Sequence, residues 1–242
     1  MMDKQEIVTI SQFPVLSTTR EPLAQRLLDV IARGDKLALF FANTNFIVKN
    51  RFVLSEPDSG RFIIVNDGIG MEIAARLMKA GSFMSNLNGT DFTPYLFAHS
   101  AQPLRVFMLG ARPEVLAKAV SHARTVLGQE VVGSCDGHDG LRQSQDLVAR
   151  INASRAQVVL VAMGNPIQEQ WILRNQQALD ANVLVGVGAL FDFWAGGKPR
   201  APAWVQRLRM EWFYRLLQEP RRLLRRYTWD ILVFLRQCYK YR

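Results

Sequence analysis

Short runs of consecutive apolar residues recur along the chain, and stretches with apolar residues at helical spacing separate most of them. Uninterrupted Val, Ile, Leu and Phe are typical of strands with both faces buried, as in a parallel sheet. Strands that alternate with helices predict an α/β fold, in which helices cover both faces of a mostly parallel, Rossmann-like sheet. The predicted strands are Leu37–Ala42, Phe62–Asn66, Arg105–Leu109, Glu130–Gly133, Gln157–Met163 and Val183–Val187, and the predicted helices are Met71–Lys79, Pro113–Leu127, Gln143–Asn152 and Pro166–Leu179.

The pattern changes after Val187. The segment VGVGALFDFWAGGKPRAP is rich in Gly and Pro and predicts a loop. Beyond it we expect two amphipathic helices, Trp204–Gln218 and Arg221 to about Tyr239, with a break at Glu219-Pro220. The apolar positions that define their faces are Trp204, Leu208, Trp212 and Leu216 in the first helix, and Leu224, Tyr227, Ile231 and Phe234 or Leu235 in the second.

All of the net charge comes from the last 45 residues. Residues 198–242 contain twelve Lys or Arg and three Asp or Glu, a net charge of +9, whereas residues 1–197 contain eighteen of each kind. This contrast predicts a neutral core over residues 1–197 and a basic helical appendage over residues 198–242. Basic side chains beside many aromatics favour an anionic, partly apolar partner such as membrane lipid or a lipid-linked diphosphate. The alternative is a solvated basic face that packs on the body.

The sequence shows no segment that is expected to span a bilayer, since no run of about 18 uncharged apolar residues occurs. Its first residues, MMDKQEIVTISQF, lack the basic and then apolar pattern of a signal peptide. The two cysteines are far apart, without metal-ligand spacing, and are expected to be reduced. These features predict a cytoplasmic protein, peripherally attached to the inner membrane through its basic appendage.

Polar residues follow the predicted strands where the strands end. Asn43, Thr44 and Asn45 come directly after LALFFA, and their amides and hydroxyl suit hydrogen bonding to sugar hydroxyls. Ligands of such sheets bind at the carboxyl ends of the strands, so these three residues are candidates for substrate binding. The alternative is that they only end the strand and cap the next helix.

Asp67 follows the next strand, within the sequence NDGIG. A carboxylate at this edge of the sheet can accept the proton of a sugar hydroxyl as a general base. The alternative role is a helix N-cap within an Asp-Gly turn. The two glycines match the start of a dinucleotide-binding fingerprint, but Ile73 occupies the third glycine position, so that motif fails.

Gly164, Asn165 and Gln168 lie in MGNPIQEQW, after the longest predicted strand. Glycine permits close backbone approach, and the following proline suits the first turn of a helix. Gln168 is expected to face the cleft from that turn, and the helix N-terminus can also hold a phosphate. The alternative is ordinary helix initiation.

The chain contains no Asp-x-Asp sequence, which argues against the usual metal-bridged site for a nucleotide-sugar diphosphate. Arginine side chains, which can pair with phosphate through two hydrogen bonds, would then replace the metal ion. Neither a metal nor a cofactor is therefore expected.

Four segments together resemble the WecG/TagA/CpsF family of glycosyltransferases, which make bacterial surface polysaccharides: DGIG, MGNPIQEQW, VGVGALFDFWAGGKPRAP and EWFYRLLQEPRRLLRRY. The likeness runs from about Leu37 to Tyr227. It implies transfer of a sugar from a UDP-sugar to a polyprenyl-diphosphate-linked sugar at the cytoplasmic face of the membrane. It also implies inversion at the anomeric carbon without a metal, and it is compatible with homo-oligomers.

The resemblance further implies roles for single residues. Asp67 matches the proposed general base of the family, and Gln168 matches its proposed active-site glutamine. Asn165 and Asp192 lie in the matching segments and are assigned to substrate binding. A C-terminal appendage of the family closes over the site, holds the diphosphate and docks on the membrane. Its matching arginines are Arg215, Arg222 and Arg225.

The sequence departs from the family pattern in two places. Asn45 matches the usual Thr-x-Asn after the first strand, but Asn43 replaces the threonine. Ser85-Asn86 replaces the usual Glu-Arg, and loss of that arginine argues against N-acetylmannosamine or its uronate as the donor sugar. These changes are closer to the GumM-type branch of exopolysaccharide synthesis, which uses glucose, so UDP-glucose is the expected donor. The runner-up is N-acetylmannosamine or its uronate, in teichoic acid or enterobacterial-type glycan synthesis.

Two other classes of function are weighed against glycosyl transfer. A nucleotide-dependent oxidoreductase is disfavoured by the incomplete glycine fingerprint. A non-catalytic protein could dock on membranes or nucleic acid through its basic tail. Nucleic-acid binding is not expected, because the body of the chain carries no excess of positive charge.

Overall fold

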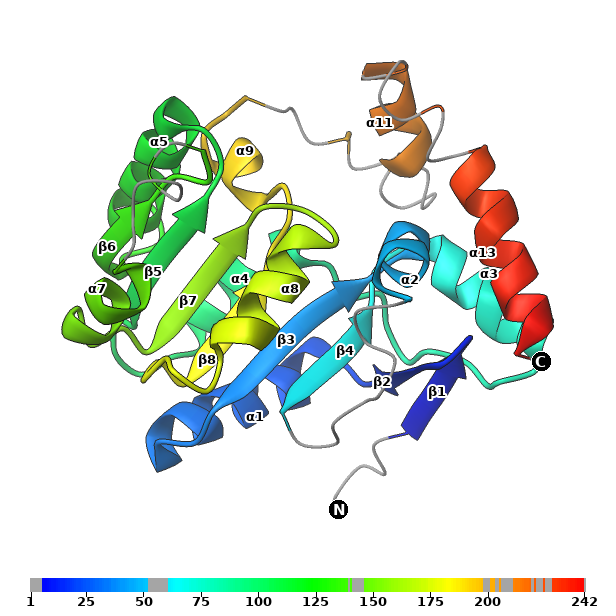
Figure 1. Cartoon of the computed structure of the whole chain (residues 1–242), viewed down its shortest axis with the longest axis horizontal. Coiled ribbons are helices and arrows are strands. Elements are labelled where there is room, and N and C mark those ends of the chain that lie inside the picture. Colours follow the sequence, from blue (N-terminus) through cyan, green and yellow to red (C-terminus); the bar gives the residue numbers. More distant parts are fainter. Residues whose placement is uncertain are drawn as a thin grey trace.

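The computed structural model describes residues 6–51, 61–138, 140, 146–197, 201–202, 205, 211–218, 220, 224 and 228–241. Within this part of the chain, eight strands form one sheet that helices cover on both faces (Figure 1). The α/β fold class is therefore confirmed. The strands are β1 (Glu6–Ile10), β2 (Phe13–Ser17), β3 (Leu37–Ala42), β4 (Phe62–Asn66), β5 (Arg105–Gly110), β6 (Glu130–Cys135), β7 (Val158–Ala162) and β8 (Val183–Gly186).

The strand order is β1-β2-β4-β3-β8-β7-β5-β6. All neighbouring strands from β2 to β6 in this order pair in parallel, and β1 pairs with β2 in an antiparallel hairpin at one edge. The six predicted strands are confirmed, although β6 extends two residues further, to Cys135, and β7 and β8 are shorter than expected. The hairpin was not predicted.

The helices lie between the strands and after the last strand. The predicted loop after Val187 was wrong in part, because it contains the short helix α9, and the predicted helix Pro166–Leu179 ends earlier, at Asn175. Helices α1, α2 and α4 were not predicted. The described helices are α1 (Arg20–Arg33), α2 (Thr44–Asn50), α3 (Ile69–Met78), α4 (Gly89–Ala98), α5 (Pro113–Thr125), α7 (Leu147–Ala153), α8 (Ile167–Asn175), α9 (Leu190–Trp194), α11 (Glu211–Gln218) and α13 (Trp229–Lys240).

Each face of the sheet has its own hydrophobic core. The strand β3 shows the division, since Ala38 and Phe40 point into one core whereas Leu39 and Phe41 point into the other. All six residues of β3 are buried, as its uninterrupted apolar sequence predicts. Helices α2, α3, α7, α8 and α13 bury side chains in the first core, and helices α1, α4, α5 and α9 bury side chains in the second.

The C-terminal helix α13 packs on the body against α2 and α3 (Figure 1). Phe234 and Cys238 are 2% and 3% exposed, and both belong to the first core. The second predicted apolar face is therefore confirmed at Phe234, whereas Leu224 and Leu235 are exposed. Residues 221–223 and 225–227 of the predicted helix lie outside the described residues, as do Trp204 and Leu208 of the helix before it. No described helix is long and apolar enough to cross a bilayer.

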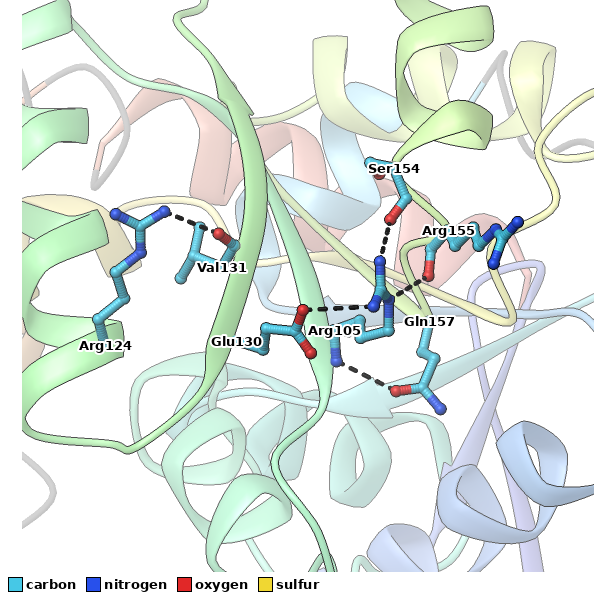
Figure 2. Close-up of polar contacts among 7 residues, drawn as sticks. All are labelled: Arg105, Arg124, Glu130, Val131, Ser154, Arg155 and Gln157. Carbon is cyan, nitrogen blue, oxygen red and sulfur yellow. Dashed lines mark hydrogen bonds and ion pairs between the residues drawn. The ribbon is translucent and has the colours of Figure 1, made fainter.

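A network around Arg105 joins elements at the amino end of the sheet (Figure 2). The Arg105 guanidinium donates to the backbone oxygens of Ser154, at 2.7 Å, and Arg155, at 3.0 Å, just after α7. It also pairs with Glu130 of β6 at 3.3 Å. Gln157 accepts a hydrogen bond from the backbone nitrogen of Arg105. One side chain at the start of β5 thus holds the end of α7 and the start of β6.

This network predicts the effect of removing the guanidinium. Arg105→Met should lower the free energy of unfolding by about 1–3 kcal/mol, since hydrogen bonds to charged groups typically contribute that much. Arg124→Met is the matched control, because Arg124 donates one hydrogen bond, to the Val131 oxygen (Figure 2), and its removal should lower the free energy of unfolding by less than Arg105→Met does. Urea unfolding of both variants provides the measurement. Equal losses in the two variants would contradict the role of the network.

Candidate active site

The chain leaves the neighbouring strands β3 and β8 toward opposite faces of the sheet. After β3, helix α2 buries Phe46 and Ile47 in the first core, whereas after β8, helix α9 buries Leu190 and Phe191 in the second. We call the carboxyl ends of β3 and β8, where the chain changes from one face of the sheet to the other, the reversal point. In open α/β sheets, ligands typically bind in a crevice at such a point. The candidate residues that follow β3, β4, β7 and β8 therefore gather around this point.

Asn43 and Asp67 meet at this edge, as the side chains after β3 and β4. The Asn43 amide nitrogen donates to Oδ2 of Asp67 at 3.3 Å. The amide oxygen of Asn43 accepts from the backbone nitrogen of Phe46 at 3.1 Å, so Asn43 is also the N-cap of α2. The capping and the functional interpretations of Asn43 are therefore compatible, because the two ends of one amide serve both partners.

Asp67 is not the N-cap of α3. The capping position is Gly68, whose φ of 99° lies in the region that favours glycine. The backbone nitrogen of Asp67 donates to the Ala42 oxygen at 2.7 Å, which keeps the residue beside the end of β3. The Gly68 nitrogen donates to the side-chain oxygen of Asn86. The Asp67 carboxylate is thus held at the sheet edge without a capping role.

Helices α2 and α3 approach each other closely where they begin. A Cβ on Gly70 would lie 2.5 Å from the Thr44 methyl group, so only glycine fits there without a shift. Thr44 and Asn45 are half-buried in the first turn of α2. Both helices also contact α13. The C-terminal helix is therefore attached to the two helices that start at the candidate site.

The Gln168 amide joins the loops after β7 and β8. Its Oε1 accepts from the backbone nitrogens of Gly164, at 3.2 Å, and Gly188, at 3.0 Å. Its Nε2 donates to Asn165 Oδ1, at 3.3 Å, and Glu169 Oε1, at 2.7 Å. These four bonds use both acceptor positions and both donor hydrogens of the amide. Gln168 is 4% exposed, so its side chain lies beneath the protein surface, whereas the sequence predicts that it faces the cleft.

Glu169 is fully buried beside Gln168. Burial raises the pKa of its carboxyl from 4.5 to about 7, while hydrogen bonds from Gln168, from its own backbone and from Asn50 act in the opposite direction. Its Oε2 and the Oδ1 of Asn50 have no hydrogen-bond partner among the described residues. When the Glu169 carboxyl is protonated, its O–H can act as a hydrogen-bond donor beside these buried oxygens.

Three residues near the site were missed by reasoning from sequence. Asn86 was noted only as a departure from a family pattern, and Glu169 only as part of a segment. Asn66, the last residue of β4, is fully buried, and neither atom of its amide has a partner among the described residues. Unpaired buried amides are rare in folded proteins and call for an explanation. Burial reveals Asn66 and Glu169, and the hydrogen bond from the Gly68 nitrogen reveals the exposed Asn86, because the spacing of these residues carries no signal.

Of the four remaining predicted site residues, the structure describes Asp192 completely and Arg215 only in its backbone. Asp192 lies in the first turn of α9, across the reversal point from Asn43. The backbone of Arg215 lies in α11, and its side chain lies outside what the structure describes, as do Arg222 and Arg225 entirely. Within the described residues, no three His, Cys, Asp or Glu side chains form a group that could hold a metal ion.

The buried carboxyl predicts how stability depends on pH. The folded protein holds the Glu169 proton more tightly than the unfolded chain, so the free energy of unfolding should fall as the pH rises from about 4.5 to about 7. Glu169→Gln cannot ionise and should be more stable than the wild type by a few kcal/mol at pH 8, with little difference near pH 4. Thermal unfolding across this pH range measures the effect.

The control is Glu21→Gln, which changes an exposed glutamate in the first turn of α1. Its stability should follow the wild type at every pH to within a few tenths of a kcal/mol. Parallel curves for Glu169→Gln and the wild type would show that folding leaves the pKa of Glu169 unchanged, which would contradict the prediction.

The reversal point, the buried polar braces beneath it and the carboxylate at its edge are compatible with an enzyme that binds a polar substrate across the strand ends. A comparison with protein families identifies which kind of enzyme. Residues 8–242 match the model described as the glycosyl transferase WecG/TagA/CpsF family. The match covers nearly the whole chain, including the C-terminal helices, and agrees with the four segments that resemble this family. The chain belongs to the WecG/TagA/CpsF family of glycosyltransferases.

Proposed function

We propose that this glycosyltransferase moves glucose from UDP-glucose to a polyprenyl-diphosphate-linked sugar in bacterial exopolysaccharide synthesis, with inversion and without a metal ion. The Asn43–Asp67 pair at the reversal point carries this proposal. A carboxylate held by a neutral amide at a ligand-binding edge has the chemistry of a general base for a sugar hydroxyl.

In the proposed reaction, the Asp67 carboxylate accepts the proton of the acceptor hydroxyl. The hydroxyl oxygen attacks the anomeric carbon of the donor from the face opposite UDP, a new glycosidic bond forms and the bond to UDP breaks. The electron pair of that bond leaves with the diphosphate. Asn43 fixes one oxygen of Asp67 through its hydrogen bond. Asn45 and Thr44, in the same loop, are proposed to bind sugar hydroxyls.

The donor diphosphate is proposed to lie near Gly164 and Asn165, at the start of α8. Positive helix ends favour phosphate. We assign the larger share of charge stabilisation to Arg215, Arg222 and Arg225 of the basic appendage, which can pair with phosphate oxygens through two hydrogen bonds each. The zero net charge of residues 1–197 supports this assignment, since the appendage carries all of the net positive charge of the chain. Asp192 is proposed to contact the nucleoside.

The appendage over residues 198–242 is also proposed to bind the inner face of the cytoplasmic membrane. Its described helices expose large apolar side chains, which soluble surfaces rarely gather. Together with a net charge of +9, they suit an anionic lipid surface. The exposed side chains include Trp212, Phe213 and Leu217 of α11 and Trp229, Leu232 and Tyr239 of α13.

Glucose is favoured over an N-acetylated or anionic donor by the loop that faces Asp67. Asn86, which stands where the family pattern has arginine, uses its side-chain oxygen to accept from the Gly68 nitrogen. Ser85 donates to the Thr18 oxygen at 2.9 Å. This loop therefore presents neutral groups, which suit a neutral hexose better than a uronate.

Replacing the proposed base tests the reaction. Asp67→Asn should lower kcat by about 10²–10⁴-fold while the protein stays folded, because a general base typically contributes that much. Asp29→Asn, in an exposed i,i+4 pair on α1, is the matched control and should leave kcat unchanged. Turnover is measured with a panel of UDP-sugars and a detergent-soluble lipid-diphosphate sugar. If Asp67→Asn keeps more than about a tenth of wild-type turnover, the assignment of the base is wrong.

The arginines of the appendage provide a second test. Replacing Arg215, Arg222 and Arg225 together with Ala should lower turnover of the detergent-soluble acceptor by at least about 100-fold, since it removes the partners of the leaving diphosphate. Replacing Arg221, Arg226 and Arg236 removes equal charge from the appendage and should mainly weaken binding to acidic liposomes. Equal kinetic losses in the two triple variants would show that only the total charge matters.

A further inference from the structure

We propose that Glu169 is a positioning residue for the donor crevice, because it holds the Gln168 amide in the orientation that ties the loop after β7 to the loop after β8. The proposal rests on the proposed function, since it assigns those two loops to the UDP-sugar. It gives Glu169 a role in catalysis through Gln168, without contact with the substrate.

The orientation of the Gln168 amide is determined by its partners. The backbone groups of Gly164 and Gly188 are N–H donors, so both require the oxygen of the amide. The amide nitrogen must then point toward Asn165 and Glu169. Glu169 accepts the shortest of the four bonds, at 2.7 Å, compared with 3.3 Å for Asn165. Glu169 is therefore the stronger of the two partners that keep the amide from turning over.

The packing of β8 against the Gln168 amide leaves the amide little room to move. A Cβ added to Gly186, at the end of β8, would lie 3.0 Å from Gln168 Nε2 and 3.3 Å from the Phe40 ring. The amide thus rests on the backbone of β8, at a position where only glycine leaves ordinary contact distances. Because interiors are close-packed, a small change at this point displaces the amide and not the sheet beneath it.

The Gln168 amide determines how far apart the loops after β7 and β8 lie. One oxygen atom receives hydrogen bonds from both glycine nitrogens, at 3.2 and 3.0 Å. Gly164 and Gly188 both have positive φ, at 77° and 55°, so each loop bends sharply at the bonded residue. If the amide turns, both N–H groups lose their acceptor, and the loops are free to separate. A displacement of about 1 Å in a binding site can cost on the order of 10²-fold in rate.

The partner of Gln168 is a buried carboxyl group that has no counter-ion among the residues the structure describes. Burial raises the pKa of Glu169, and the amides of Gln168 and Asn50 and the backbone of Glu169 itself lower it. A neutral carboxyl accepts from Gln168 through one oxygen and offers a donor through the other. The neutral amide of a glutamine has the same arrangement of acceptor and donor, whereas a leucine of similar size has neither.

This difference provides the test, with UDP as the probe. Glu169→Leu should weaken UDP binding by about tenfold and raise KM for the UDP-sugar, while KM for the acceptor, which lies near Asp67, stays within about twofold. Glu169→Gln should restore UDP affinity to within about threefold of the wild type. Calorimetry measures UDP binding at pH 7, independently of turnover, and steady-state kinetics provides the two KM values.

A double-mutant cycle shows whether Glu169 acts through Gln168. Gln168→Leu should weaken UDP binding at least as much as Glu169→Leu, and adding Glu169→Leu to it should change the affinity by less than about twofold. Gly186→Ala is an independent perturbation, because its methyl group displaces the amide while Glu169 remains in place. It should weaken UDP binding even if Glu169→Leu fails to fold.

The outcomes separate the two proposals. Wild-type UDP affinity in both Glu169→Leu and Gly186→Ala, or full additivity in the cycle, would overturn the positioning role. Wild-type protein that binds UDP but transfers no sugar to a lipid-diphosphate acceptor would contradict the proposed reaction, and the UDP measurements would still decide the role of Glu169. Equal rises in the KM values of donor and acceptor would indicate general loosening of the fold and would also overturn the positioning role.

Discussion

The parallel pairing of β3 with β8 is the constraint on which the candidate site depends. It joins strands that lie about 140 residues apart in sequence, and its register sets Leu37 beside Val183 and Phe40 beside Gly186. Because α2 leaves β3 toward one face and α9 leaves β8 toward the other, the carboxyl ends of this pair are the place where ligands of open α/β sheets bind. Asp67 comes to the crevice through the neighbouring β4, and Gln168 through β7. Without the β3–β8 pairing, the proposed base and the loops that are proposed to bind the donor would lie on separate pieces of the sheet.

The polar groups at this edge form two layers with different tasks. The upper layer contains Asn43 and Asp67, which are half-buried and have the chemistry to meet a substrate. The lower layer contains Gln168 and Glu169, which are nearly or fully buried. Gln168 donates a hydrogen bond to Glu169 and accepts hydrogen bonds from two backbone nitrogens. The net positive charge of the protein lies elsewhere, in residues 198–242. The helix α13 attaches that part of the chain to α2 and α3, which begin at the upper layer.

The sequence predicted the central parallel strands β3, β7 and β8 well because each is an apolar run buried on both faces. It missed β2, since Pro14 interrupts the run, and β1, since its residue Ile7 is exposed at the sheet edge. Helix α4 was missed because it contains Gly89 and Pro94, which weaken a helical pattern. Helix α1 could have been predicted, because Gly34 is a typical residue to end a helix. The strand ends predicted that Asn43 and Asp67 lie at the carboxyl edge of the sheet, where the structure places them in contact. The hydrogen bonding of Gln168 could not be foreseen, because it depends on loops that the β7–β8 pairing brings together.

The central claim is that the donor binds across the carboxyl ends of β3, β4, β7 and β8. Hydrogen–deuterium exchange of the backbone amides, with and without UDP-glucose, tests it most directly. We expect slower exchange in the segments 42–46, 66–70, 163–168 and 186–192, and no change in the hairpin formed by β1 and β2. Slower exchange confined to other parts of the sheet, or no change anywhere at saturating donor, would contradict the claim.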